Sequence, residues 1–186
     1  MATGARVRAT TVRVRDHFVN ARYGRTARER FRAAASPDLR AALAASGDAW
    51  VDFALFIEAN ELVCSMFGGG NIALAREIGR FGAETNIGTW RGIVHRILSP
   101  RIFLGIATGL WSHHYDSGRL VLETVDERTL RMKLCEFPRP HLTHCLAIAG
   151  WIERTIELGR PRSVHVRKTA CRLDGAPACE FLASWE

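Results

Sequence analysis

The chain has 186 residues, of which 47% are apolar and 24% are charged. These are ordinary values for a globular protein, and the length allows a sizeable core. No run of roughly eighteen apolar residues occurs, and MATGARVRATTVRVR lacks the apolar stretch of a signal peptide. We therefore expect no membrane span, and we expect the protein in the cytosol.

The net charge of +7 is unevenly distributed, because the first 40 residues hold ten arginines and three acidic residues. A basic segment of this kind suits nucleic acid, anionic lipid or an acidic partner protein. Arginine outnumbers lysine by 24 to 2, which indicates a coding bias. We therefore interpret the arginines of ARYGRTARERFRAA as the solvated face of a helix. The sequence shows no zinc finger, RNP motif or convincing helix-turn-helix, so a nucleic-acid-associated regulator ranks third among the functions considered.

The N-terminal half is predicted to be helical after a short lead-in. Residues 1–11 are expected to form a flexible basic tail and residues 12–186 a single ligand-binding-type domain. TVRVRDHFV alternates for a few residues, which is typical of a short strand. Residues 25–45 favour helix, with a break near Ser36-Pro37. Asp48 is expected to cap a long core helix, which the glycines of GGGN at 68–71 end.

Two further helices are predicted over residues 72–84 and 87–98, and Ser99-Pro100 opens another. After Trp111 the period changes to that of strands, and Leu130, Met132 and Leu134 alternate with charged residues as in a half-buried antiparallel strand. A helix from about residue 141 to 158 precedes a closing hairpin. Helices, then strands, one helix and strands again predict an α+β fold, with a helical N-terminal half packed on an antiparallel sheet.

The five cysteines are an odd number and are widely spread, so in a reducing compartment free thiols or metal ligands are expected (Cys64, Cys135, Cys145, Cys171 and Cys179). KTACRLDGAPACEFLASWE places Cys171 and Cys179 on either side of a glycine-containing turn, so both thiols can meet at the mouth of one hairpin. Strict alternation puts them on opposite faces, and a bulge in the turn would reconcile them.

A helical first half, a strand pair after Trp111, a long helix and the hairpin pattern C-x7-C-x-F resemble the 4-vinyl-reductase-type small-molecule-binding domain. That domain belongs to a superfamily with the TRAPP vesicle-tethering subunits and the haem-based nitric-oxide sensor domains. The chain is also similar to a family of uncharacterised proteins abundant in myxobacteria. The resemblance covers residues 12–186 and is most specific in the last twenty residues.

The resemblance implies a metal site. In the phenol-sensing members, the hairpin cysteines bind zinc with a cysteine on the preceding helix and a glutamate three residues before the first hairpin cysteine. Cys145, Cys171 and Cys179 match the thiol positions, but Lys168 stands at the glutamate position. Three thiolates suit zinc, with a fourth ligand from water or from one of three histidines (His141, His144 and His165). The alternative is that the cysteines are small buried core residues.

Haem is the other cofactor that the resemblance implies. The stretch from Tyr115 to Arg119 fits the Y-x-S-x-R pattern with which the nitric-oxide sensor domains hold haem propionates. Those domains also need a proximal histidine roughly thirty residues earlier, where Asn86 stands, and His95 comes about ten residues too late. We therefore rank zinc ahead of haem, and a haem cofactor is not expected.

In ligand-binding members the small molecule lies between the helical layer and the sheet. The candidates here are aromatic residues and histidines, each of which ordinary core or surface packing would also explain (Trp90, His95, Phe103, Trp111 and His113). No nucleophile elbow, HExxH motif or P-loop occurs, so we expect no enzyme.

The expected function is that of a cytosolic sensory module. It would bind a small apolar or aromatic molecule, a lipid or an acyl chain, and would transmit occupancy to a protein partner. The alternative is an adaptor of TRAPP-like fold with no ligand. The resemblance also implies a homodimer.

Overall fold

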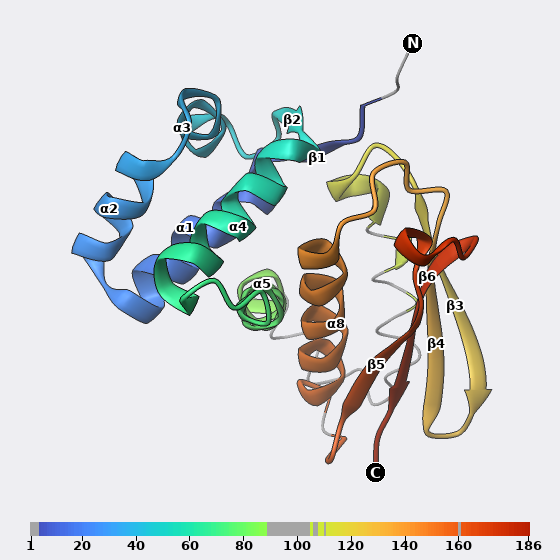
Figure 1. The fold of residues 1–186 in the computed structure, drawn as a ribbon. Coiled ribbons are helices and arrows are strands. Elements are labelled where there is room, and N and C mark those ends of the chain that lie inside the picture. The colour runs from blue at the N-terminus through green and yellow to red at the C-terminus, as the bar shows by residue number, and fades with distance from the viewer. Residues whose placement is uncertain (1–3, 89–104, 106–107, 110, 160) are drawn as a thin grey trace.

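The computed structural model describes residues 4–88, 105, 108–109, 111–159 and 161–186. A helical end, a central helix pair and a sheet follow one another across the molecule (Figure 1). The helical end contains α1 (Ala9–Tyr23), α2 (Arg25–Ala34), α3 (Pro37–Ala44) and α4 (Phe53–Gly68). The pair consists of α5 (Leu74–Gly88) and α8 (Leu142–Glu157). The predicted α+β class, with a helical half and an antiparallel sheet, is confirmed.

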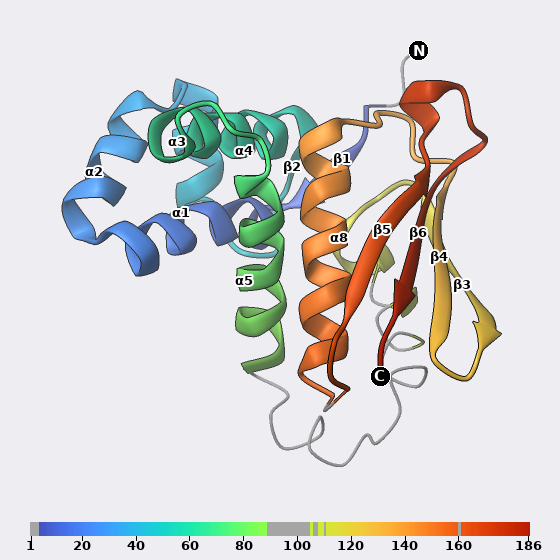
Figure 2. The same cartoon turned by 60° about the horizontal axis from the view of Figure 1, so that its bottom comes forward.

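The sheet contains β3 (Arg119–Asp126), β4 (Thr129–Cys135), β5 (His165–Ala170) and β6 (Ala178–Ser184), antiparallel in the order β3-β4-β6-β5. A short 3-10 helix, η1 (Arg172–Asp174), joins β5 to β6. On β4, Leu130, Met132 and Leu134 are at most 2% exposed, which confirms the alternation predicted for this strand. In Figure 2, α8 stands between α5 and the sheet, and it packs against both.

The structure differs from the sequence-based expectation at two places near the N-terminus. TVRVRDHFV lies in helix α1, because Val12, Phe18 and Val19 form one buried helical face. Residues 6–11, expected in a flexible tail, form β1 (Arg6–Arg8) and the first turn of α1. β1 pairs with β2 (Trp50–Asp52).

The same strand pair sets the start of α4. Because Trp50–Asp52 are held in β2, α4 begins at Phe53 instead of near Ala49. Asp52 is the N-cap, and its carboxylate accepts a hydrogen bond of 2.6 Å from the backbone N–H of Ala54. The predicted cap, Asp48, lies before the strand.

Helices α5 and α8 touch through their backbones. A Cβ atom added to Gly79 would lie 1.9 Å from the carbonyl oxygen of Ala147, and one added to Gly150 would lie 2.0 Å from that of Arg76. Only glycine permits this approach. Ion pairs flank the contact, since Arg76 binds Glu153 at 2.7 Å and Arg80 binds Glu157 at 2.8 Å. No helix among the described residues is long and apolar enough to span a membrane.

Gly79→Ala and Gly150→Ala should each lower the free energy of unfolding by about 2 kcal/mol, because the added methyl group overpacks a backbone contact. Alanine would otherwise favour a helix by about 1 kcal/mol. Gly82→Ala is the matched control on α5, since its Cβ would lie 3.4 Å from a Val14 methyl group, and its stability should be unchanged or higher. Urea denaturation measures all three. An equal free energy of unfolding for Gly79→Ala and Gly82→Ala would contradict the close contact between the two helices.

Candidate functional site

An aromatic cluster lies where α4 and α8 meet the segments next to β3 and β4. We define it by six residues: Phe53, Phe56, Trp111, Tyr115, Phe137 and His144. Trp111 and Tyr115 stack at 3.9 Å between ring centroids. The His144 ring centroid is 4.9 Å from that of Phe53 and 5.1 Å from that of Phe137. The imidazole is therefore surrounded by rings that come from both the helical end and the sheet side.

His144 is a polar group enclosed in apolar surroundings. It is 1% exposed, and its Nε2 has no hydrogen-bond partner among the described residues. Burial, helped by the charge of Arg15, lowers the pKa of His144 to about 3. The imidazole is therefore neutral at physiological pH, with a ring nitrogen available to a ligand.

Arg15 brings a buried cation to the same place from α1. It is 3% exposed, and its Nε donates to Oδ1 of Asn60 at 2.8 Å. Its Nη1 donates to the carbonyl of Thr11 at 2.7 Å, and its guanidinium lies 3.7 Å from the centre of the Phe56 ring. Burial lowers the pKa of Arg15 to about 10, so it stays charged at neutral pH.

Tyr115 and Asn60 complete the polar part of this region. Burial raises the pKa of Tyr115 to about 12, so its phenol is protonated. Asn60 is 0% exposed, and its Nδ2 donates to Oγ1 of Thr143 at 3.4 Å, which links α4 to α8. One cation and several neutral hydrogen-bonding groups thus face an aromatic surface.

Of the ligand-binding residues predicted from the sequence, Trp111 lies in the aromatic cluster. It is 7% exposed, and its Nε1 donates to the carbonyl of Ser117 at 2.9 Å. His113 lies on the surface, where its backbone carbonyl accepts from Arg8. Trp90, His95 and Phe103 lie outside the described residues.

The sequence analysis missed Arg15 as a site residue. The arginine excess hid it, because ten arginines fall in the first 40 residues, and the stretch TVRVRDHFV that contains Arg15 was predicted as a short strand. The helical spacing of Val12, Arg15 and Val19 is the signal that places Arg15 on the buried face of α1.

One hollow of the described structure lies elsewhere. It has a volume of about 660 Å³ between α3, β2 and α4, and its lining includes a run of small side chains (Ala41, Ala42, Ala45, Ala49 and Ala54). It is open to solvent and holds none of the buried polar groups of the aromatic cluster. We therefore place the candidate site at the cluster.

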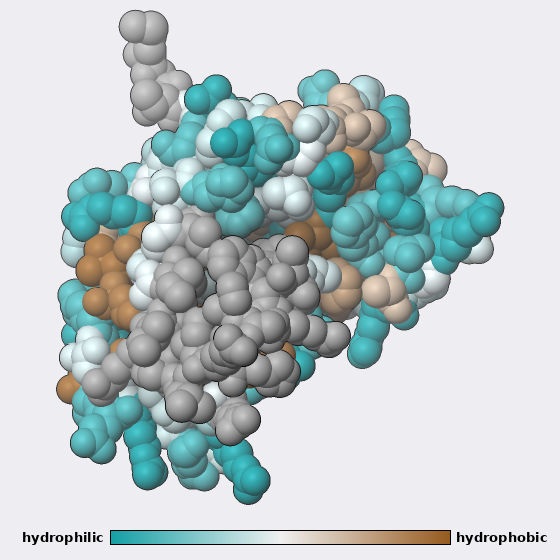
Figure 3. All heavy atoms as spheres, turned by 180° about the vertical axis from the view of Figure 1, so that it is seen from behind, coloured by the Kyte–Doolittle hydropathy of each residue, from teal (hydrophilic) through white to brown (hydrophobic). Residues whose placement is uncertain are grey.

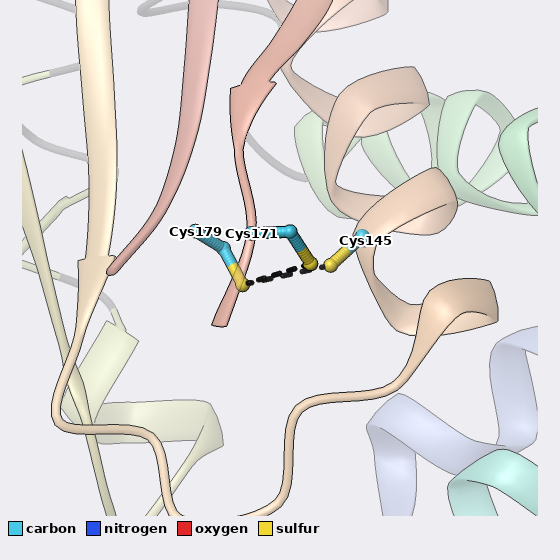
Figure 4. Close-up of side chains that lie close together, drawn as sticks. All are labelled: Cys145, Cys171 and Cys179. Atoms are coloured by element: carbon cyan, nitrogen blue, oxygen red, sulfur yellow. Dashed lines mark hydrogen bonds between the residues drawn. The ribbon is translucent and has the colours of Figure 1, made fainter. Parts of the chain in front are cut away.

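A second constellation, the thiol cluster of Cys145, Cys171 and Cys179, is shown in Figure 4. The three sulfur atoms lie within 4.8 Å of one another, and each residue is at most 3% exposed. The Sγ of Cys179 is 3.8 Å from that of Cys145 and 3.8 Å from that of Cys171. The convergence predicted from the hairpin pattern is confirmed.

A break in the strand register brings the two hairpin thiols to one face. The pairing of β5 with β6 shifts between Lys168 and Ala170, and beyond it Cys171 faces the same side as Cys179. The expected bulge is thus present, although it lies in β5 before the turn.

Lys168 lies close enough to the thiol cluster to interact with it electrostatically. Partial burial lowers the pKa of Lys168, but Cys171 and Cys145 raise it more. The pKa of Cys179 is lowered, first by the hydrogen bond from Cys145 and also by the N–H of Arg172 and the charge of Lys168. This environment favours one thiolate.

Among the described residues, no histidine or carboxylate lies close enough to the three sulfur atoms to act as a fourth ligand. His144 belongs to the aromatic cluster, and His165 is exposed on β5. Nε2 of His141 is 3.4 Å from a Glu61 carboxylate oxygen. The part of the chain that the structure describes therefore supplies three soft ligands at this place.

No family model matches the chain, and a search of curated proteins found no significant match. Solved structures do match. An H-NOX protein from S. oneidensis in the Fe(II)NO ligation state has a TM-score of 0.74 at 10% identity, over 96% of this chain and 99% of that one. Unliganded Fe(II) H-NOX from K. algicida has a TM-score of 0.68 at 10% identity, over 96% of each chain. A mutant of T. tengcongensis H-NOX has a TM-score of 0.60 at 14% identity, over 96% of this chain and 97% of that one.

The chain therefore has the fold of the H-NOX proteins. This result corrects one expectation. We ranked zinc ahead of haem and did not expect haem, but a further structure of this fold, with a TM-score of 0.61 at 13% identity, comes from work on haem distortion in the H-NOX family. The spacing of a single histidine was too weak a reason to set haem aside.

The Y-x-S-x-R pattern does not converge on one point in the structure. Tyr115 belongs to the aromatic cluster, whereas Arg119 is exposed on β3 and pairs with Glu136 at 3.2 Å. Asp116, between them, binds Arg6 at 2.7 Å. A buried cation that does contact an aromatic ring of the cluster is Arg15, from another part of the chain.

His144→Phe should raise the free energy of unfolding of the ligand-free protein by about 1 kcal/mol. It keeps a ring in the cluster and removes a buried nitrogen without a partner. Thr155→Val is the matched control on α8, because its hydroxyl is also buried and unpartnered, and it should stabilise by a similar amount. Chemical denaturation of both variants tests this. Destabilisation by His144→Phe alone would show that the imidazole is already satisfied.

Proposed function

We propose that this protein is a non-enzymatic, cytosolic sensory module that binds a small molecule at the aromatic cluster and transmits occupancy to a protein partner. One observation supports this most: a charged guanidinium, and an imidazole whose Nε2 has no partner among the described residues, are buried against aromatic rings where the helical end meets the sheet side. Such groups cost stability in a purely structural core. We also propose that the protein is related to the 4-vinyl-reductase-type domains and to the myxobacterial family. The same relationship leads us to propose that it forms a homodimer.

Haem is the first ligand to test, because several proteins of this fold are described by the ligation of their iron. A haem iron supplies an open coordination position for a diatomic gas. In this chain, the neutral imidazole of His144 suits iron, and the guanidinium of Arg15 suits a propionate. His95 lies outside the described residues and is a second imidazole to test.

Incubation of the purified protein with haemin, phenols and fatty acids should raise its melting temperature for at least one compound, because a ligand that binds only the folded state stabilises it. Haemin binding should also sharpen and shift the Soret absorbance. His144→Phe should weaken this response, whereas exposed His113→Phe should not. A protein that ignores the whole panel, and that carries no ligand in native mass spectrometry, would contradict the sensory proposal and favour a TRAPP-like adaptor.

The exposed surface offers less support for the adaptor. Around the grey atoms, Figure 3 shows hydrophilic residues with apolar groups between them. The large exposed apolar residues of the described chain lie on five separate elements or loops (Tyr23, Ile72, Val125, Leu142 and Leu173). A docking face for a permanent partner would gather such residues together.

We also propose that Cys145, Cys171 and Cys179 hold a soft metal ion, with water as the remaining ligand. Support comes from the three buried sulfurs within 4.8 Å of one another. The ammonium group of Lys168 opposes a cation there, since it lies near all three thiols.

Cobalt(II) is a direct probe of this site, because thiolate ligation gives it charge-transfer absorbance. Titration under reducing conditions should give one ion per chain for the wild type. Cys179→Ser should abolish the absorbance, Lys168→Glu should strengthen binding by at least about tenfold, and Cys64→Ser, far from the cluster in sequence, should change nothing. Absence of the absorbance in both the wild type and Lys168→Glu would exclude a thiolate metal site.

A further inference from the structure

Arg15 is a buried cation without a carboxylate partner among the described residues. Its side-chain hydrogen bonds go to the neutral oxygens of Asn60 and Thr11. Buried charges in proteins are normally paired, because removing a charge from water is costly in a low-dielectric interior. The contact with the Phe56 ring offsets only part of this cost.

The nearest acid in the sequence is already neutralised. Asp16 is 1% exposed and accepts hydrogen bonds from Arg28 at 2.6 Å and from Arg32 at 2.7 Å. Although burial opposes it, hydrogen bonds from Arg32 and Arg28 hold the pKa of Asp16 below its ordinary value. Two arginines thus share one carboxylate, and Arg15 has none.

The rest of the chain does not supply the missing anion either. The residues that the structure leaves undescribed contain no aspartate or glutamate. No described carboxylate lies within 4.0 Å of Arg15, and no carboxylate affects its pKa, which burial lowers and Tyr115 raises. The counter-ion of Arg15 must therefore be solvent or a ligand.

A second polar group points to a ligand at the same place. The Phe56 ring touches both Arg15, at 3.7 Å from its centre to Cζ, and His144, at 5.2 Å between ring centroids. The Nε2 atom of His144 is buried and has no partner among the described residues. Tyr115 lies 5.5 Å from His144 between ring centroids. An anion beside Arg15 would thus meet further hydrogen-bonding groups and an aromatic surface.

We propose that Arg15 is the counter-ion of a carboxylate ligand whose apolar body packs against the aromatic cluster. This inference rests on the proposed sensory function and names the class of its ligand. A guanidinium binds a carboxylate through parallel N–H donors, and the pair is strong where water is excluded. The aromatic rings provide contact area for an aryl or alkyl body.

The test compares acids with their neutral isosteres on the full chain. Benzoate represents an aromatic acid and decanoate a fatty acid, with benzamide and decanamide as neutral partners. We expect at least one acid to raise the melting temperature of the wild type, and its amide to bind at least about tenfold more weakly, because the charged hydrogen bonds are lost. The acid that binds distinguishes the two sources of the carboxylate.

Three variants connect this binding to Arg15. Arg15→Met should weaken binding of the acid by at least about tenfold. Arg15→Lys keeps the charge but loses the paired N–H donors of the guanidinium, so it should weaken binding less. Arg22→Met is the matched control, because Arg22 lies exposed near the end of the same helix, and it should bind as the wild type does. If Arg15→Met does not fold, Arg15→Lys and the comparison of acid with amide still test whether Arg15 binds the carboxylate.

The failures are distinguishable. Equal binding of acid and amide, or equal binding of the acid to Arg15→Met and wild type, would overturn the role of Arg15 and leave the sensory function standing. Binding of phenols, which carry no carboxylate, without binding of either acid would do the same. A wild-type protein that binds no compound of either panel would overturn both proposals.

Discussion

The backbone contact between α5 and α8 is the constraint on which the rest of the structure depends. Gly79 and Gly150 let the two helices approach until their carbonyl oxygens would touch any added Cβ. This contact fixes α8 against α5, while another side of α8 packs on β5 and β6. His144 and Cys145 are consecutive on α8, so they project about 100° apart. One faces the aromatic cluster and the other the thiol cluster. Any displacement of α8 therefore moves both sites.

Much of the sheet side could be predicted from local pattern. The alternation around Met132 predicted a half-buried strand, because strand geometry has a period of two. The spacing of Cys171 and Cys179 predicted a hairpin, whereas the convergence of their thiols depends on the register break in β5, which strict alternation does not supply. The helical end was harder. TVRVRDHFV satisfies both the strand and the helix period, and the β1–β2 pair that moved the start of α4 joins segments more than 40 residues apart in the sequence. Such a pairing has no local signal.

The candidate site could be predicted only in part, for a different reason. Trp111 was named because the resemblance implied a ligand between the helical layer and the sheet, with aromatic residues as candidates. Arg15 was not found, because the sequence contains 24 arginines and burial depends on which neighbours pack over each one. Asp16 and Arg15 are adjacent, yet one is doubly paired and the other unpaired. That asymmetry arises from α2, whose arginines reach Asp16, and it becomes visible only in three dimensions.

Likeness of fold and likeness of site are separate matters in this protein. The H-NOX fold is shared at about 10% identity, a level at which the scaffold is retained while side chains are replaced freely. A guanidinium on the surface contributes little to carboxylate binding, because water and salt screen it, whereas a desolvated one interacts strongly. Arg119, in the Y-x-S-x-R pattern, is exposed and paired with Glu136, while Arg15 is buried and unpaired. Anion recognition by this chain should therefore follow the buried cation on α1, even where the sequence motif points to β3.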